Sequence, residues 1–199
     1  MAFDKPFLDL DKQLNLLESR KLIITNRDRA KRLIMTSSYY DLINGYKSVF
    51  MLSNDRFKDN VKLEDIYIFS FIDKGIQSIT MKYSLMIETL FKTRLSYVIS
   101  NHLGVHQDDY LHARYYKRQI NHLSFAKVKQ EINKQLDICN AKQPTKYYLK
   151  YHNHVPPWIL FKNISFGSAI NIFRLLSTKH KREVANLLLP TDLITCKDK

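Results

Sequence analysis

An arginine and a histidine, Arg174 and His180, are the residues whose types and spacing best match acid–base chemistry on a phosphodiester. In metal-independent ribonucleases a histidine can move the proton of a 2′-hydroxyl while an arginine stabilises the charge on the phosphate. On a helix, a separation of five intervening residues brings two side chains only loosely to one face. A basic chain with seven histidines produces such a match readily, so the pair is a candidate catalytic site and no more.

The remaining histidines and the two cysteines raise the question of a metal site. His102 and His106 have the i, i+4 spacing of a helical ligand pair, but Gly104 lies between them and no HExxH motif occurs. Cys139 and Cys196 form neither a CxxC pair nor a disulfide framework. The chain also lacks GxxxxGK[ST], GxGxxG and GxSxG motifs. We therefore expect no metal, no cofactor, and two reduced thiols in the cytoplasm.

The chain is strongly basic, with 32 Lys and Arg against 19 Asp and Glu and a formal net charge of +13 over 199 residues. A positive surface of this kind binds polyanions by neutralising phosphates, so nucleic acid is the expected partner. The alternative is that the charge only keeps the protein soluble.

The charge is concentrated between Tyr110 and Val155, where nine basic residues face two acidic ones. Tyrosines at 110, 115, 116, 147, 148 and 151 are interleaved with them. Tyrosine rings stack on unpaired bases at about 1–3 kcal/mol each, so the segment predicts binding of single-stranded or looped RNA. A solvated helix face with the tyrosines in the core is the alternative. The predicted RNA contacts here are Arg114, Tyr115, Tyr116, Lys117, Arg118, Lys127 and Lys146.

Helices must position these residues. Four glycines and five prolines leave the chain short of turn signals, and no strand alternation is evident. From Leu63 to His102, apolar residues recur in alternating steps of three and four, which predicts one helix of up to 40 residues with a kink near Gly75 and a stop at Gly104. No stretch is apolar enough to span a membrane. The fold class is therefore all-α, a helical bundle with one very long central helix.

Shorter helices complete this bundle, with Asn26 as the N-cap of the second one. They are predicted at 7–20, 27–36, 39–52, 125–138, 158–173 and 181–189. Loops are predicted at 105–122 and in the proline-bracketed connector 144–157. The predicted organisation is a helical lobe at 1–60, a bundle at 61–190 and a frayed tail at 191–199.

Several segments together resemble bacterial abortive-infection (Abi) proteins of the AbiD/AbiF type. They are residues 5–8 (KPFL), 13–24 (QLNLLESRKLII), 39–46 (YYDLINGY), Phe57, 63–67 (LEDIY), Asp73, Ile87, Glu88, Arg94, 155–160 (VPPWIL) and 165–167 (SFG). These elements follow the family's order over residues 5–177. Each is weak alone, and the combination is specific.

The resemblance implies a helical fold related to the HEPN ribonucleases and a role in phage defence through cleaving or sequestering RNA, in some members with a structured non-coding RNA. The family's catalytic signature is an Arg-Asn…His-His segment beyond the SFG region, which this sequence lacks. The chain resembles the N-terminal two-thirds of a member, with an incomplete HEPN-like bundle. The catalytic role is therefore not carried onto Arg174 and His180.

Within the matched motif, Glu88 and Arg94 are polar residues of the long helix. They could organise an RNA-facing surface, with Arg94 as a further RNA contact, or form ion pairs with helix neighbours.

Three functional hypotheses follow. The first is an RNA-binding abortive-infection protein without intrinsic cleavage. The second is a ribonuclease that uses Arg174 and His180, across a homodimer. The third is a protein-interaction module whose charge serves solubility.

Overall fold

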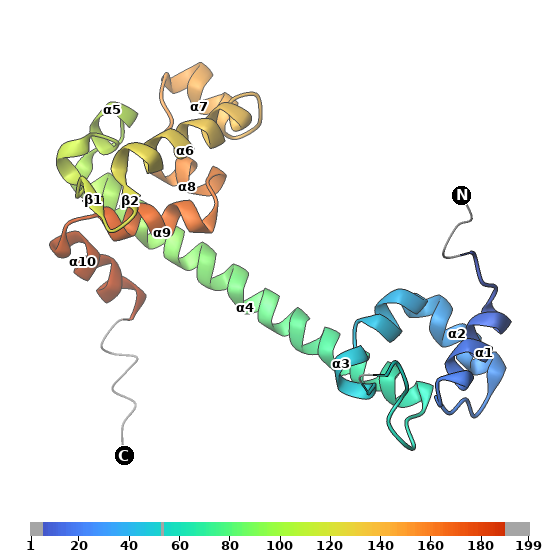
Figure 1. The fold of residues 1–199 in the computed structure, drawn as a ribbon. Helices are drawn as coiled ribbons and strands as arrows, with labels where there is room; N and C mark the ends of the chain where they lie inside the picture. Colours follow the sequence, from blue (N-terminus) through green and yellow to red (C-terminus); the bar gives the residue numbers. More distant parts are fainter. Residues whose placement is uncertain (1–5, 53, 190–199) are drawn as a thin grey trace, which may run out of the picture. The chain divides into compact units, whose positions relative to one another are not determined.

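A computed structural model describes residues 6–52 and 54–189, and helices dominate it (Figure 1). The chain divides into two compact units, which we call unit 1 (Met1–Lys82) and unit 2 (Tyr83–Lys199). The all-α prediction is confirmed. The predicted tail at 191–199 and Cys196 lie outside the described residues. In the part of the chain that is described, no helix is long and apolar enough to cross a membrane.

The predicted long helix is confirmed as α4, Leu63–Leu103, which contributes to both units. It continues without a break through Gly75, where nothing lies within 4 Å of the place that a β-carbon would take. It ends at Gly104, whose φ of 99° is in the left-handed region that favours glycine. The predicted stop is therefore confirmed.

Unit 1 begins with α1 (Leu10–Ser19) and α2 (Arg27–Ser37), which pack against each other. The predicted cap of α2 is confirmed, because the Asn26 side chain accepts a 2.9 Å hydrogen bond from the backbone N–H of Arg29. The buried core of this unit is formed by Leu14, Leu17, Leu22, Ala30, Ile34, Leu42, Ile43, Met51, Phe57, Leu63 and Ile66.

The helical segment predicted at 39–52 is interrupted at Gly45, a residue that costs a helix stability and suggests close packing or a break. The chain forms a π-helical turn, η1 (Tyr40–Asn44), and then a short helix, α3 (Lys47–Phe50). A β-carbon on Gly45 would lie 2.3 Å from the carbonyl oxygen of Asp41, so this tight junction requires glycine.

Unit 2 contains the short helix α5 (Gln107–Tyr110), the 3₁₀ turn η2 (Ala113–Tyr115), and a two-stranded antiparallel hairpin of β1 (Gln119–Ile120) and β2 (Leu123–Ser124). The segment 105–122, predicted as a loop, therefore carries regular structure. The remaining helices are α6 (Phe125–Cys139), α7 (Thr145–His152), α8 (Pro157–Asn163), α9 (Phe166–Leu175) and α10 (Thr178–Leu188).

Two other predictions in unit 2 are wrong. The connector 144–157 contains α7. The helix predicted at 158–173 is divided into α8 and α9, because the Ser165 hydroxyl accepts a hydrogen bond from the backbone N–H of Ser168 and starts a new helix.

The core of unit 2 forms around the C-terminal part of α4. Leu95, Val98, Ile99 and Leu103 of α4 are buried together with apolar residues of α6, α8, α9 and α10. Figure 1 shows α6, α8 and α9 gathered at this end of α4. The core thus holds α6 and α7 by their inner faces and leaves the outer faces available for function.

Candidate nucleic-acid interface

Nine cationic side chains of unit 2 form no ion pair with a carboxylate among the described residues. They are Arg114, Lys117, Arg118, Lys127, Lys129, Lys134, Lys142, Lys146 and Lys150. Within the described residues, none of them is in an ion pair. All except Lys129 are exposed. This cationic surface can therefore meet an external anion without breaking an internal ion pair.

The outer face of α7 combines cations and rings. Two lysines and two tyrosines lie on one side of the helix, because the steps between them in the sequence are one, three and one. They are Lys146, Tyr147, Lys150 and Tyr151. We call these four residues the α7 platform. The side chains of Tyr147 and Tyr151 are 48% and 61% exposed, with ring centroids 4.8 Å apart. The ammonium of Lys150 lies 5.0 Å from the centre of the Tyr151 ring.

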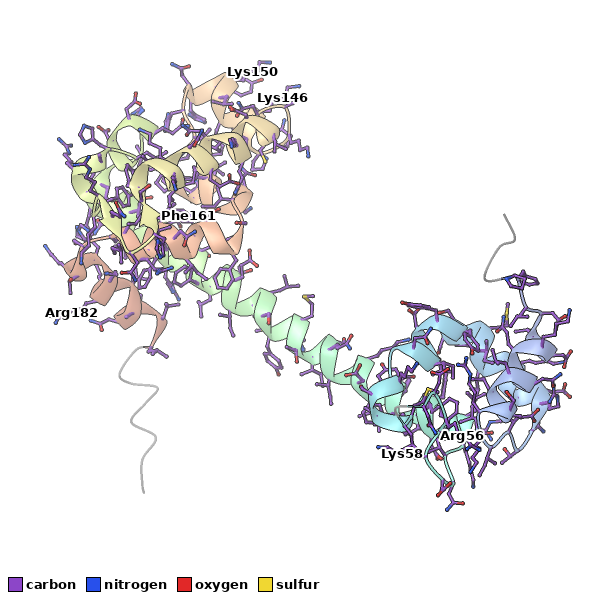
Figure 2. All side chains as sticks on the ribbon, in the orientation of Figure 1. Arg56, Lys58, Lys146, Lys150, Phe161 and Arg182 are labelled. Carbon is purple, nitrogen blue, oxygen red and sulfur yellow. The ribbon has the colours of Figure 1, made fainter. Side chains whose placement is uncertain are left out.

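Figure 2 shows Lys146 and Lys150 on the outer side of α7, whereas Phe161 lies in the interior of the unit. The platform therefore offers ring surface for stacking beside charge for phosphate binding.

The inner side of α7 is anchored to the core. Thr145 is buried, and its hydroxyl oxygen accepts a 2.6 Å hydrogen bond from the Asn163 side-chain amide of α8. Tyr148 and Leu149 pack against the core, and the Tyr148 hydroxyl accepts a hydrogen bond from the indole N–H of Trp158 at 3.2 Å. These contacts fix which of the α7 tyrosines face outward.

Helix α6 links the α7 platform to the β-hairpin. Ser124 caps its first turn, and Val128, Ile132 and Leu136 are buried on its inner face. Lys127 and Lys134 are exposed and seven residues apart, so they lie on the same side of the helix. At about 1.5 Å per residue, the cations of α6 extend the charged surface over roughly 10 Å.

The predicted contacts Arg114, Lys117 and Arg118 lie before α6. The Arg114 guanidinium is 4.6 Å from the centre of the Tyr115 ring and donates a 2.6 Å hydrogen bond to its hydroxyl. The backbone N–H of Lys117 donates to the carbonyl oxygen of Leu175 at 2.8 Å, which anchors this segment to α9. All three cations are exposed.

Tyr116 does not fit its predicted role. Only 7% of the residue is exposed, its ring stacks on Phe125 at 4.4 Å, and its hydroxyl donates a 2.7 Å hydrogen bond to the Tyr110 carbonyl oxygen. Tyr110 is also buried, and burial raises the pKa of both phenols above the ordinary value. For these two tyrosines the alternative, a place in the core, is confirmed.

Glu88 forms an ion pair with Lys92, one turn along α4, at 2.6 Å. The Lys92 ammonium also donates to the carbonyl oxygen of Ile164 at 2.6 Å, so the pair ties α4 to the segment between α8 and α9. Arg94 is exposed and is in no ion pair with a described residue. Glu88 thus forms an ion pair with a helix neighbour, and Arg94 lies on a different helix from the α7 platform.

A cleft of about 490 Å³ opens beside this ion pair. It lies between α4 and α8, and its lining includes Glu88, Lys92, Trp158, Phe161 and Lys162. Trp158 is half-exposed and hydrogen-bonded to Tyr148 of α7. The indole ring of Trp158 therefore connects helix α7 with the cleft. Trp158 was not among the predicted RNA contacts, although a tryptophan so near the basic segment was a usable signal.

His180 has a partner that the sequence analysis did not predict. Its ring stacks on that of His102 of α4, with centroids 5.0 Å apart. His102 Nε2 lies 2.7 Å from a carboxylate oxygen of Glu183, and the Ser177 hydroxyl lies 3.2 Å from His180 Nδ1. Burial lowers the pKa of the His180 imidazole; His102 and Lys179 lower it further, and Glu183 opposes them.

Arg174 is not joined to His180 by any hydrogen bond between described residues. It instead lines a hollow with Ile120, Asn121, His122 and Leu123 of the hairpin. The ring contact of His180 is thus with His102, and a catalytic role of Arg174 and His180 stays a prediction. No group of three or more His, Cys, Asp or Glu side chains that could hold a metal ion occurs among residues 6–52 and 54–189.

Comparison with known proteins assigns the sequence to a family. Neither the curated proteins nor the solved structures contain a match to the chain. A family model described as Abi-like protein matches residues 32–196, which is 165 of the 199 residues and includes all of unit 2 up to the tail. The chain therefore belongs to the Abi-like protein family.

Proposed function

We propose that this protein acts in abortive infection, the defence against phage that its family suggests, by binding single-stranded or looped RNA on the cationic surface of unit 2. The observation that carries the proposal is the set of nine cations that have no ion pair with a described carboxylate, combined with the exposed rings of Tyr147 and Tyr151. Cations neutralise phosphates, and exposed rings stack on unpaired bases whatever their sequence. A HEPN-related bundle, as the sequence resemblance implies, is part of this proposal.

The proposed mode of binding runs along one side of the unit. The cations of α6 follow the phosphates, and the bases turn toward the α7 platform and Trp158. A double helix would keep its bases stacked and out of reach of these rings, so unpaired RNA is the better fit. Solubility alone does not account for exposed tyrosines beside the cations.

The test is binding of a single-stranded RNA and of a duplex of the same length, measured by fluorescence anisotropy as the salt concentration is raised. If about five phosphates are neutralised, the logarithm of affinity should fall with the logarithm of salt with a slope of roughly −3.5 for a single strand. The single strand should bind more tightly than the duplex. Affinity that does not change with salt contradicts the proposal and favours a protein-interaction module.

The His102–His180 pair supports a second candidate, a metal-independent ribonuclease. The lowered pKa of His180 favours the neutral imidazole that a general base needs. His180 would take the proton of the 2′-hydroxyl, and that oxygen would attack the adjacent phosphorus. The 5′-oxygen would leave with a proton from the imidazolium of His102, giving a 2′,3′-cyclic phosphate and a 5′-hydroxyl.

A cleavage assay with purified protein in a chelator tests this candidate. If it is right, His180→Ala and His102→Ala should each abolish cleavage, while Arg174→Ala, at a position outside this pair, should have a smaller effect. If wild type and His180→Ala give the same cleavage, or none, the ribonuclease candidate is rejected and RNA binding is unaffected.

A further inference from the structure

The cleft between α4 and α8, which we call the α4–α8 cleft, is lined by none of the nine cations of the cationic surface. Its volume of about 490 Å³ lies in the range of about 300–1,000 Å³ that is typical of small-molecule sites. A cleft of this size can take a ligand as large as one nucleotide, whereas a duplex or a protein helix is too large for it. All of its lining residues belong to unit 2.

The two walls of the cleft differ in chemistry. One wall is a stripe of polar side chains at helical spacing on α4, namely Glu88, Thr89, Lys92, Thr93 and Ser96. The other wall is apolar and aromatic and comes from α8, with Trp158, Ile159 and Phe161. A fatty acyl chain would leave the polar wall without hydrogen-bond partners, and a sugar would leave the aromatic wall unused. A flat heterocycle with a polar edge fits both walls, and a nucleobase is such a ligand.

The aromatic wall offers a ring for stacking. Trp158 is 45% exposed, and its indole N–H donates a 3.2 Å hydrogen bond to the Tyr148 hydroxyl, which restricts the rotation of the ring. Phe161 is buried and lies in the interior of the unit (Figure 2), so it belongs to the rigid part of the wall. Stacking on a tryptophan does not depend on the identity of the base, because every base has a π-face.

The polar wall offers a hydrogen-bond donor beside an acceptor. The Lys92 ammonium, whose side chain is 13% exposed, donates 2.6 Å hydrogen bonds to Glu88 Oε1 and to the Ile164 carbonyl oxygen. An ammonium has three N–H donors, so one remains beyond these two bonds between described residues. Among the described residues, no hydrogen bond reaches the second carboxylate oxygen of Glu88. A base presents donors and acceptors side by side on its Watson–Crick edge, which is free only when the base is unpaired.

A further cation of α8 is placed to meet a phosphate. Lys162 lines the cleft, is exposed, and follows Trp158 by one helical turn, so the two side chains lie on the same side of α8. It forms no ion pair with a described carboxylate. A nucleotide whose base lies against Trp158 would therefore carry its phosphate near the Lys162 ammonium.

We propose that the α4–α8 cleft binds one unpaired nucleobase together with its phosphate. The base stacks on Trp158, its Watson–Crick edge bonds to Glu88 and Lys92, and its phosphate binds to Lys162. The base can come from an RNA on the cationic surface or from a free nucleotide, and only the first source rests on the proposed function.

Tryptophan fluorescence of the full chain tests the proposal, because Trp158 is the one tryptophan in the sequence. Adenosine 5′-monophosphate should quench this fluorescence in a saturable way, whereas ribose 5-phosphate, which lacks a base, should not. Adenosine should bind more weakly than the nucleotide, and Lys162→Ala should remove this difference. Quenching that does not saturate, or that ribose 5-phosphate causes equally, would overturn the proposal.

Two variants test the polar wall. Thr89→Phe places a ring in the cleft and should abolish the saturable quenching. The matched control Met81→Phe places a ring on an exposed position of α4 outside the cleft and should leave the quenching unchanged. Glu88→Gln keeps the size of the side chain and removes its charge, so nucleotide affinity should fall about tenfold. This second variant covers the case in which circular dichroism shows that Thr89→Phe fails to fold. Wild-type affinity in Glu88→Gln, or in a folded Thr89→Phe, would overturn the proposal.

Competition separates the two sources of the base. If a single-stranded RNA displaces the nucleotide, the base comes from RNA. If RNA binds with the expected salt slope and leaves the nucleotide in place, the cleft takes a free nucleotide, and both outcomes support the cleft as a nucleobase site. A protein that binds no RNA but is quenched by the nucleotide would contradict the proposed function alone, and RNA binding without any quenching would contradict the cleft alone.

Discussion

The two units of this protein use their charged residues differently. Unit 1 has 14 Lys and Arg against 11 Asp and Glu, and unit 2 has 18 against 8. Among the described residues, unit 1 contains a network in which Arg27 pairs with Glu18 and Asp11, Lys31 with Asp11, and Arg20 and Lys47 with Asp55. In unit 2 the described ion pairs are Lys92–Glu88 and His102–Glu183. More Lys and Arg side chains serve ion pairs in unit 1 than in unit 2, where Lys92 is the one described Lys or Arg that does so.

The hydrophobic cores provide the largest expected effect. Leu160→Ala in unit 2 and Leu14→Ala in unit 1 each truncate a fully buried side chain and should cost about 2–5 kcal/mol. Because the two clusters of buried residues share no member, each variant should lose hydrogen-exchange protection in its own unit. Equal loss of protection in both units from either variant would show that the cores are not independent.

Charge reversal tests the contrast between the units directly. Lys146→Glu/Lys150→Glu on the α7 platform should reduce RNA affinity more than tenfold and reduce the salt slope by about two. The matched control is Arg32→Glu/Arg56→Glu in unit 1, where both side chains are exposed and outside the described ion pairs. An equal loss of affinity in both variants would mean that only net charge matters.

Removal of a platform ring should have a smaller effect. Tyr151→Ala keeps the charge and removes one stacking ring, so RNA affinity should fall about tenfold with an unchanged salt slope. Tyr40→Ala removes a ring from unit 1 that is 73% exposed and should leave affinity unchanged. A changed salt slope in the tyrosine variant would point to a disturbed helix α7, not to lost stacking.

The ion pairs of the two units should differ in their contribution to stability. Lys92→Met removes the partner of Glu88 and the donor to the Ile164 carbonyl, and it should reduce the free energy of unfolding by about 1 kcal/mol. Lys31→Met breaks a pair with Asp11 on the surface and should have a smaller effect. Chemical denaturation measures both, and a larger effect of Lys31→Met would reverse the expected ranking.

The smallest effect concerns pH. The pKa of His180 is lower in the folded chain than the usual 6.5, so below that pH the unfolded state binds more protons. The neutral His180 imidazole contributes fully to the free energy of unfolding above pH 6.5. This contribution is lost as the pH falls through the pKa that His180 has in the folded chain. His180→Asn, which cannot take up this proton, should show a flatter dependence of the melting temperature on pH in this range. An identical pH profile in wild type and variant would contradict the assigned shift.

Predictions from local pattern succeeded where one strong signal dominated. The steps of three and four from Leu63 onward are sufficient to predict α4, and Asn26 is recognisable as a cap from its place before an apolar stripe. The division between α8 and α9 was not predicted, because the local sequence does not distinguish a serine inside a helix from a serine that caps the next helix. For Ser165, the contact of its backbone N–H with the Gln135 side chain of α6 supports the second role.

The candidate site was predicted less completely than the fold. Tyr115 and Tyr116 are adjacent and identical in type, yet the first contacts Arg114 at the surface while the second is buried against Phe125. Trp158 comes near the platform through its bond to Tyr148, ten residues away. The cations of the interface were predicted because the charge of a residue follows from its type. Whether a tyrosine ring is exposed depends on packing and does not follow from its type.

Periodicity and charge are properties of neighbouring residues, so the helical class, the position of the long helix and the excess of cations in one segment were predictable without coordinates. Which tyrosines remain outside, and the contact of His180 with His102, 78 positions earlier, could be seen only in the folded chain. Those outcomes depend on which helix covers which face, and packing between distant segments leaves no mark in the spacing of either segment alone.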